Sequence, residues 1–417
     1  MPENYTIDMP EAVRNIIHTI EEHGFKAYAV GGCIRDSILG RNPDDWDITT
    51  SAVPAQIKTF FKRTIDTGIV HGTVTVMVNK TGYEVTTYRI DGEYEDGRHP
   101  KSVEFSDRLV DDLCRRDFTI NAMAYNDTDG FVDEFNGLDD LDAKIIRCVG
   151  EPELRFTEDA LRMMRAIRFS AQLGFTIDEA TWNAIKKLAP SISKISMERV
   201  HVELGKTLMS AHPDYVAQYS EAGLFAPILP IIDNALKSRY KRKILATLQH
   251  ILDNIYLRYA ALFITSTPDE AAKTLRALKL DNKTVDTVSK LVELSKIDIE
   301  ETEPAVRTAL NQYGRDFLPL WHELMMAVIQ ASEDITGISN PAKVKHLLTL
   351  KRLATDILAR GDCFTIKDLD ISGNDLIEYG LQGHEIGETL KSLLDIVIEN
   401  PKLNDKATLI AMIEHIK

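Results

Sequence analysis

The sequence AYAVGGCIRDSILGRNPDDWDITTS, residues 27–51, decides the fold of the N-terminal part of the chain. It begins with a short apolar and aromatic run typical of a strand, continues through two glycines and then enters a helical segment. Glycines at such a turn let an anion approach the backbone N–H groups closely, so Gly32 and Arg35 are candidate phosphate contacts. By itself, a strand followed by two glycines more often marks only a tight turn.

An Asp-x-Asp triplet closes the same stretch. Asp45 and Asp47 flank Trp46, and on an extended segment residues i and i+2 point to the same side. Two facing carboxylates repel each other unless a cation lies between them, and hard oxygen ligands of this kind suit Mg²⁺. An isolated triplet is more often a solvated turn, but its spacing from Gly32 and Arg35 favours a metal site.

The flanking sequence predicts an α+β fold. Short β-branched or aromatic runs bounded by glycine predict strands at residues 27–30, 73–78 and 83–88, which together make a small mixed sheet. Helices are predicted at residues 11–22 and 34–39. After about residue 140, apolar residues recur three and four apart, so we expect the remainder of the chain to be helical.

The composition is that of a globular protein of two to four domains. Of 417 residues, 44% are apolar and 27% are charged, which excludes wholesale disorder and a fibrous repeat. The net charge of −15 argues against a protein that coats nucleic acid by bulk electrostatics, although residues 144–206 carry 11 Lys and Arg against 8 Asp and Glu. We expect a cytoplasmic protein with reduced thiols, because no membrane span, secretory signal or paired cysteine motif is evident.

The run RRDFTINAMAYN, residues 115–126, places two cations beside an acid. Arg116 can pair with a triphosphate, while Asp117 and Asn121 can hydrogen-bond a ribose hydroxyl. The alternative is a surface ion-pair cluster. Glu84, on a predicted strand, is a candidate third carboxylate, although a single Glu on a strand usually faces solvent.

A further helix is predicted to begin after Thr157, because threonine is a good N-cap residue. On that helix Asp159 and Arg162 lie at positions i and i+3. This is the spacing of an ordinary helix salt bridge, worth about 0.2–0.5 kcal/mol.

Taken together, these motifs resemble a known family. The pattern GGxxRDxxLGxxxxDxD, residues 31–47, resembles the head of the class II tRNA nucleotidyltransferases, the CCA-adding enzymes, which are relatives of bacterial poly(A) polymerases in the polymerase-β superfamily. The resemblance is nearly continuous over the first 208 residues and returns at 371–390, whereas 209–340 match only as generic helix. Other stretches that look like family motifs, in family order, are HGTVTVMV (71–78), EVTTYR (84–89), DGEYEDGRHPKSVEF (91–105), RRDFTINAMAYN (115–126), EFNGLDDL (134–141), RFTEDALRMMRAIRFSAQLGF (155–175) and ISMERVHVELGKTL (195–208).

The resemblance implies a domain plan and a reaction. We expect a polymerase-β-like nucleotidyltransferase head at 1–143, a helical neck with a nucleotide-selecting helix at 144–208, a helical body at 209–340 and a helical, tRNA-binding tail at 341–417. The 3′ hydroxyl of a tRNA attacks the α-phosphorus of CTP or ATP, and pyrophosphate leaves, so that C, C and A are added without a template. Two Mg²⁺ ions held by the Asp-x-Asp carboxylates lower the pKa of the hydroxyl and neutralise charge on the pyrophosphate.

Base selection is implied to rest on Asp159 and Arg162. A carboxylate beside a guanidinium matches the amino group and unprotonated ring nitrogen that cytosine and adenine share, and it opposes the carbonyl and ring N–H of uracil and guanine. Arg165 and Arg168 follow at three-residue steps along the helix. They are better placed for the triphosphate or the RNA backbone than for base recognition.

Two further segments bear on the RNA substrate. The Gly-rich and charged residues 91–105 predict a mobile loop, and in the family such a loop is linked to the switch from C to A addition. The basic run KSRYKRK, residues 237–243, fits a solvated helix face and a tRNA phosphate contact about equally. We expect the acceptor arm of tRNA to bind the helical part by shape and phosphate contacts, and the protein to be a monomer or homodimer.

Three alternatives remain open at this point. An enzyme that adds only the terminal A shares every motif above. A poly(A) polymerase shares the head, but it is expected to carry a basic signature after the Asp-x-Asp triplet, where HGTVTV resembles the tRNA enzymes instead. A non-catalytic tRNA-binding protein has no reason to keep Asp45 and Asp47 as facing carboxylates.

Overall fold

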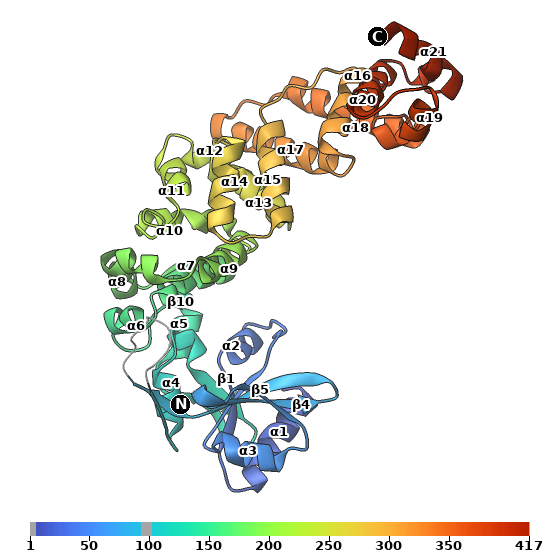
Figure 1. Cartoon of the computed structure of the whole chain (residues 1–417). Helices are drawn as coiled ribbons and strands as arrows, with labels where there is room; N and C mark the ends of the chain where they lie inside the picture. Colours follow the sequence, from blue (N-terminus) through green and yellow to red (C-terminus); the bar gives the residue numbers. More distant parts are fainter. Residues whose placement is uncertain (1–5, 93–101, 417) are drawn as a thin grey trace. The chain divides into compact units, whose positions relative to one another are not determined.

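The structure, a computed structural model, describes residues 6–92 and 102–416. The chain divides into two compact units, Met1–Pro230 and Ile231–Lys417 (Figure 1). The first unit combines a sheet with helices and the second is helical, so the predicted α+β fold with a helical remainder is confirmed. The finer division into head, neck, body and tail stays a prediction.

A seven-stranded mixed sheet forms the centre of the first unit. Every neighbouring pair of strands is antiparallel except β2 and β5, which run parallel. The strands predicted at residues 27–30 and 73–78 are β1 and β4, and the strand predicted at 83–88 is β5. In spatial order the strands are β3 (Thr64–Gly68), β4 (Thr73–Val78), β5 (Thr81–Thr87), β2 (Asp47–Thr50), β1 (Ala27–Val30), β8 (Met123–Asn126) and β9 (Gly130–Asp133).

Two helices cover one face of this sheet, as Figure 1 shows. Helix α1 (Glu11–Glu22), at the predicted bounds, packs against β1 and β2, and α3 (Pro54–Phe60) packs against β4. Strand pairing places Ile48, Val74 and Val85 on a common face, and all three side chains are fully buried. Because side chains alternate along a strand, Asp47 and Glu84 point to the opposite face.

Two small sheets lie beside the large one. Strand β6 (Arg89–Asp91) pairs antiparallel with β7 (Val103–Phe105), so strands form at both ends of the segment predicted as a loop. Residues 93–101 of that segment lie outside the described residues. Strand β10 (Ile145–Ile146) pairs in parallel with β11 (Thr176–Ile177).

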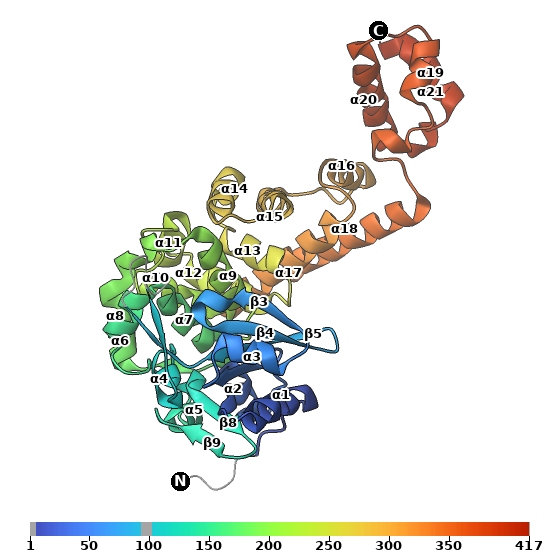
Figure 2. The ribbon, with the colours of Figure 1, turned by 60° about the horizontal axis from the view of Figure 1, so that its bottom comes forward.

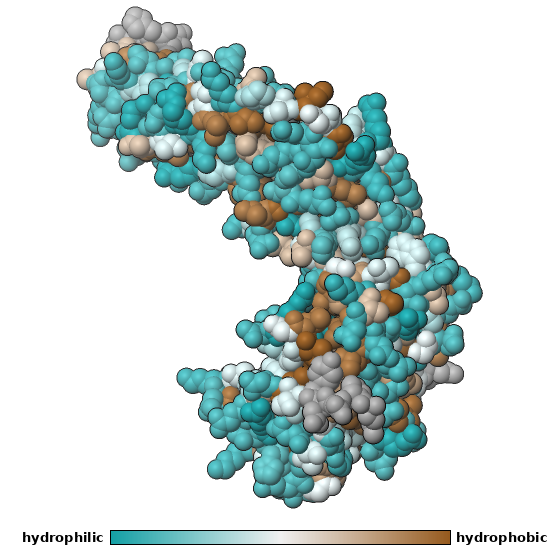
Figure 3. Space-filling view, turned by 180° about the vertical axis from the view of Figure 1, so that it is seen from behind, coloured by the Kyte–Doolittle hydropathy of each residue, from teal (hydrophilic) through white to brown (hydrophobic). Residues whose placement is uncertain are grey.

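Helices make up the rest of both units. The remaining α-helices of the first unit are α2 (Gly32–Ile38), α4 (Leu109–Cys114), α5 (Gly137–Asp142), α6 (Pro152–Glu158), α7 (Leu161–Leu173), α8 (Glu179–Leu188), α9 (Met197–Leu208) and α10 (Ala217–Glu221). Those from the unit boundary onward are α11 (Pro230–Lys237), α12 (Lys241–His250), α13 (Ile255–Leu262), α14 (Pro268–Ala277), α15 (Asn282–Leu294), α16 (Glu303–Tyr313), α17 (Phe317–Thr336), α18 (Pro341–Arg360), α19 (Gly373–Glu378), α20 (His384–Glu399) and α21 (Lys406–Ile416). None of the described helices is long and apolar enough to span a membrane. The side of the molecule drawn in Figure 3 is mostly hydrophilic.

A buried arginine joins α16 to the C-terminal helices, which Figure 2 shows gathered near the end of the chain. Arg307 on α16 is 2% exposed. Its guanidinium donates to the backbone oxygen of Ile398 at 2.6 Å, to that of Glu399 at 3.4 Å and to the carboxylate of Asp362 at 3.0 Å. A buried charge is tolerated only when it is paired and hydrogen-bonded, so this arginine ties α16 to the end of α20.

We predict that Arg307→Ala destabilises the second unit by about 3–5 kcal/mol, because it removes a buried ion pair with Asp362 and leaves the backbone oxygens of Ile398 and Glu399 without this donor. Asp362 keeps its second ion pair, with Arg360. The measurement is urea unfolding of the full chain, with hydrogen exchange to locate the loss in α16 and α20. Arg352→Ala is the matched control, since Arg352 makes an exposed i, i+4 pair with Asp356 on α18 and should cost less than about 1 kcal/mol. Equal losses of unfolding free energy in the two variants would show that the buried hydrogen bonds of Arg307 stabilise the unit no more than an exposed ion pair does.

Candidate active site

A cavity of about 660 Å³ in the first unit brings most of the predicted site residues together. Glu84, Asp159 and Arg162 are not among the residues that line it. The predicted residues that do line it are Gly32, Arg35, Asp45, Asp47, Arg116, Asp117, Asn121, Arg165 and Arg168. Carboxylates and guanidiniums from segments far apart in the sequence therefore line the same cavity.

The acidic side of the cavity is built on the start of β2. Desolvation by the surrounding protein raises the pKa of Asp47, Arg116 opposes the shift, and the charge of Asp45 adds to it. The pKa of Glu84 on β5 is also raised, by desolvation and then by the charges of Asp47 and Asp45. The three carboxylates therefore repel one another on the open face of the sheet.

This repulsion is what a divalent cation would relieve, and the oxygen donors of Asp45 and Asp47 fit such an ion. Within residues 6–92 and 102–416, however, no three His, Cys, Asp or Glu side chains come close enough together to hold a metal ion. Asp45 and Asp47 thus remain the candidate ligands. A ligand or catalytic role for Glu84 stays a prediction.

The turn at Gly31 is occupied by the guanidinium of Arg116, which lies against the glycine backbone. Gly31 has a φ of 88°, in the left-handed region that favours glycine, and a Cβ built there would lie 2.8 Å from Nη1 of Arg116. Arg116 also contacts the buried carboxylate of Asp112 at 3.3 Å. The absence of a side chain at position 31 therefore leaves room for the Arg116 guanidinium at this turn, and its charge opposes the rise that burial causes in the pKa of Asp47.

A chain of hydrogen bonds fixes the cationic side. Arg165 on α7 donates from Nε to Oδ2 of Asp117 at 2.7 Å, and Asn121 donates to Oδ1 of Asp117 at 3.1 Å. Arg35 in turn donates to the Asn121 side-chain oxygen at 2.6 Å. Burial alone would raise the pKa of Asp117, but Arg165 and Asn121 hold it well below its usual range. Asp117 and Asn121 therefore orient the arginines, and their predicted contact with a ribose stays a prediction.

The predicted i, i+3 pair of Asp159 and Arg162 is wrong for this structure. Asp159 bonds Arg199 on α9, with Nη2 and Oδ2 2.6 Å apart, whereas Arg162 bonds Glu158 at 2.6 Å. Arg162 also donates to the backbone oxygen of Arg115 at 3.0 Å. The two side chains are largely buried, and each is held by another partner.

The prediction failed because the helix does not begin at Thr157. Helix α6 already starts at Pro152, and the Thr157 hydroxyl donates to the backbone oxygen of Glu153 inside that helix instead of capping a new one. Asp159 is the C-terminal cap of α6, with extended backbone, and α7 starts at Leu161. The break between the two helices gives Asp159 an extended backbone. The N–H of Arg162 still donates to the backbone oxygen of Asp159 at 3.0 Å, but the two side chains do not pair.

Sequence reasoning missed several lining residues. Phe169 and Gln172 follow Arg165 and Arg168 along α7, so helical periodicity alone could have indicated them. Lys206 and Ser210, at and after the end of α9, carry no such local signal. They reach the cavity only through tertiary packing of α9 against α7.

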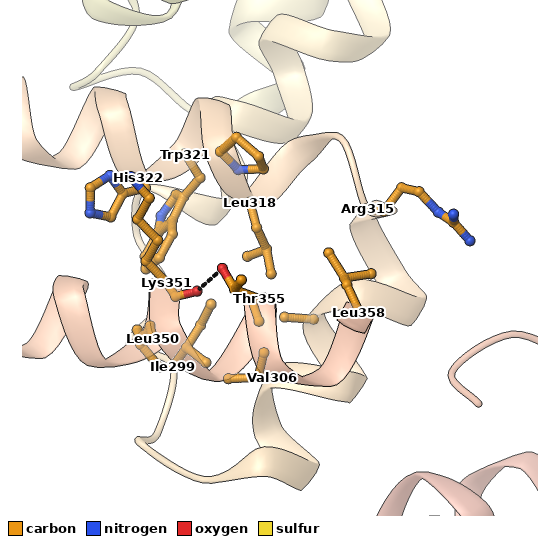
Figure 4. A pocket seen from close by; sticks show the side chains of 13 residues that line it. Ile299, Val306, Arg315, Leu318, Trp321, His322, Leu350, Lys351, Thr355 and Leu358 are labelled. Carbon is orange, nitrogen blue, oxygen red and sulfur yellow. Dashed lines mark hydrogen bonds between the residues drawn. The ribbon is translucent and has the colours of Figure 1, made fainter. Parts of the chain in front are cut away.

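A second cavity, of about 100 Å³, lies in the second unit among α16, α17 and α18 (Figure 4). Its lining includes Leu318, Trp321 and Leu350, with Arg315 and Lys351 as charged members. Asp and Glu are absent from its described lining. It therefore lacks the carboxylates that would hold a metal ion, in contrast to the cavity of the first unit that contains Asp45 and Asp47.

Comparisons with known proteins identify the family of the chain. Residues 27–147 match the family model described as Poly A polymerase head domain, residues 174–236 match an RNA and SrmB binding site of polymerase A, and residues 253–413 match a tRNA nucleotidyltransferase domain 2. The CCA-adding enzyme of Limosilactobacillus fermentum is 37% identical over 96% of this chain and 95% of its own. That of Lactiplantibacillus plantarum is 53% identical over 49% of this chain and 50% of its own.

A solved structure gives the same result for the fold. The CCA-adding enzyme of Bacillus stearothermophilus in complex with CTP has a TM-score of 0.75 and 33% identity, covering 97% of this chain and 96% of that one. Sequence similarity of this extent spans both units of the chain. The chain therefore belongs to the bacterial class II CCA-adding enzymes, a family of tRNA nucleotidyltransferases.

Proposed function

We propose that this protein adds C, C and A to the 3′ end of tRNA, using CTP and ATP without a nucleic-acid template, and that it does so in the cytoplasm. The observation that carries the proposal is the single cavity in which Asp45 and Asp47 face Arg35, Arg116, and Arg165. Arginines pair well with phosphate oxygens, and acidic oxygens hold a divalent cation, so the cavity suits a metal-bound triphosphate.

The proposed reaction is a direct nucleotidyl transfer. The oxygen of the tRNA 3′ hydroxyl forms a bond to the α-phosphorus, the bond from that phosphorus to the bridging oxygen of the β-phosphate breaks, and pyrophosphate leaves. Asp45 and Asp47 would hold Mg²⁺, which when bound acidifies the hydroxyl and neutralises charge on the phosphates. Arg116, beside Asp47, and the arginines of the cationic side orient the triphosphate, and no side-chain nucleophile is needed.

Selection of C and A over U and G is proposed to use Asp159 and Arg162. In this structure Arg199 and Glu158 hold these two groups, so reading a base requires that they exchange partners. The exchange replaces one charge-assisted hydrogen bond by another, and it is favourable only when the base offers the matching donor and acceptor.

The direct experiment uses the purified chain with three tRNA substrates: one that lacks all three terminal nucleotides, one that ends in a single C and one that ends in CC. Each is incubated with each nucleoside triphosphate separately. We expect C on the first two and A only on the third. Addition of A alone, with no C on any substrate, would indicate an A-adding enzyme.

We predict that Asp45→Ala and Asp47→Ala each lower incorporation of CTP and ATP by at least about 100-fold, because metal-ion stabilisation supplies several kcal/mol at about 1.4 kcal/mol per factor of ten. Binding of tRNA, measured by gel shift, should change little. Asp107→Ala, an exposed acid of the same unit, is the control and should keep normal activity. Near-normal transfer in both cavity variants would overturn the metal assignment.

We predict that Asp159→Ala raises UTP incorporation roughly 5- to 150-fold relative to CTP, since a bidentate reading pair is worth about 1–3 kcal/mol against the wrong base. The assay is single-nucleotide extension of tRNA lacking CCA, with the four triphosphates in parallel. Asp45→Ala should lower all four together at an unchanged ratio. Wild-type ratios in the residual activity of Asp159→Ala would mean that its ion pair is only structural.

We predict that replacing residues 93–101 by a Gly-Ser segment of equal length leaves CC addition intact and impairs addition of the terminal A. Strands β6 and β7, which flank this segment, are kept so that the fold is not disturbed. The measurement compares C incorporation on tRNA lacking CCA with A incorporation on tRNA ending in CC. If both activities fall by the same factor, the segment does not distinguish the two steps.

A further inference from the structure

Three guanidiniums of the cavity meet at one aromatic ring. The Cζ atom of Arg168 lies 3.9 Å from the centroid of the Phe169 ring, that of Arg35 lies 5.0 Å away and that of Arg165 lies 5.4 Å away. All three distances are within the roughly 6 Å over which a cation is attracted to an aromatic face. Phe169 is 6% exposed and lines the cavity together with the three arginines.

Each of these arginines also has a carboxylate of its own. Arg35 pairs with Asp36 at 2.8 Å, Arg165 with Asp117 at 2.5 Å and Arg168 with Glu203 at 2.5 Å. The three carboxylates come from different segments of the chain, so the three ion pairs do not by themselves hold the guanidiniums together. Phe169 is the contact that all three guanidiniums have in common.

The ring itself is held in place from behind. Phe118, which is fully buried, meets Phe169 edge to face, with centroids 5.8 Å apart and an interplanar angle of 80°. The adjacent residue Asp117 holds Arg165. The position of the ring is thus fixed by the same segment that fixes one of the arginines.

We propose that Phe169 is a positioning residue for the triphosphate: its ring holds Arg35, Arg165 and Arg168 together so that their remaining N–H groups face the cavity. This inference rests on the proposed function, because it assigns the three arginines to the phosphates of the nucleotide. Phe169 does not touch the reacting atoms, and its effect passes through the guanidiniums.

The chemistry requires an aromatic ring rather than an apolar side chain of similar bulk. Three like charges gathered at one point repel one another. Burial lowers the pKa of Arg168; Glu203 opposes this shift, and the charge of Arg165 adds to it. The electron-rich face of a phenyl ring attracts each cation without accepting a hydrogen bond, so the N–H donors stay available for phosphate. A leucine would fill part of the space but would supply no such attraction.

The sharpest test changes the electronic character of the ring and leaves its shape almost unaltered. Phe169 is replaced by phenylalanine carrying one, two or three fluorine atoms, which progressively withdraw charge from the ring face. The probe is inorganic tripolyphosphate in the presence of magnesium, and its affinity for the full chain is measured by calorimetry. We expect Kd to rise stepwise, by roughly ten-fold at three fluorines, while the melting temperature stays within a few degrees.

Phe175 provides the matched control. It is a buried phenylalanine just beyond the end of α7, and among the described residues no guanidinium lies over its ring. The same fluorinated residues at position 175 should leave tripolyphosphate affinity unchanged. Phe169→Leu should raise the Kd for tripolyphosphate at least as much as three fluorines do. Phe169→Tyr, which keeps an aromatic ring, should have a Kd within about three-fold of the wild-type value.

Steady-state kinetics give an independent readout. KM for CTP and for ATP should rise by the same factor across the Phe169 series, and the preference for CTP over UTP should not change, because base recognition uses other residues. A flat series at Phe169, with normal binding by the wild type, overturns the role of the ring but leaves the proposed function intact. Failure of the wild-type chain to bind tripolyphosphate or CTP overturns the nucleotide site itself, and the inference with it.

Discussion

The ion pair between Asp117 and Arg165 is the interaction on which the rest of the site depends. It joins the segment just before η2 (Thr119–Asn121), next to the sheet, to α7, and through Asn121 it also fixes Arg35. Asp117 is 8% exposed, and a buried carboxylate persists as an ion only when it is paired and hydrogen-bonded. One desolvated acid therefore orients two arginines of the cavity, Arg165 directly and Arg35 through Asn121.

Pairing of arginines with carboxylates also explains how an acidic chain can bind an anionic substrate. The chain carries 64 acids against 49 Lys and Arg, yet Arg35, Arg165 and Arg168 are gathered at one place and each is paired with a carboxylate. Those carboxylates neutralise the arginines at rest and keep them oriented, while the guanidinium edges on the cavity side remain able to donate. Local arrangement, not the net charge, decides where a triphosphate can bind.

The sequence was most informative where the determining contacts are local. Alternation and glycine boundaries located β1 and β4 at their observed bounds, and the Asp-x-Asp spacing led to the acidic wall. The pairing of Asp159 could not be foreseen, because its partner Arg199 is 40 residues away. Thr157 was misleading because a threonine can cap a helix or, as here, lie inside one and bond the preceding turn. Helical periodicity could have indicated Phe169 as a lining residue, but its contact with Arg35 could not be foreseen, since Arg35 lies on a different helix.

The anchoring of Arg307 means that α16, in the middle of the second unit, depends on the C-terminal part of that unit. Two of its hydrogen-bond acceptors are the backbone oxygens of Ile398 and Glu399, which no side-chain substitution can remove but which a shortened chain lacks. A premature stop before the end of α20 would thus leave a buried guanidinium of α16 without its backbone acceptors, and only the carboxylates of Glu303 and Asp362 would remain to accept from it. Residues near 400 are in this sense part of the folding requirement of a helix that ends at Tyr313, and a nonsense mutation there is expected to act as a folding defect rather than as the loss of a dispensable appendage.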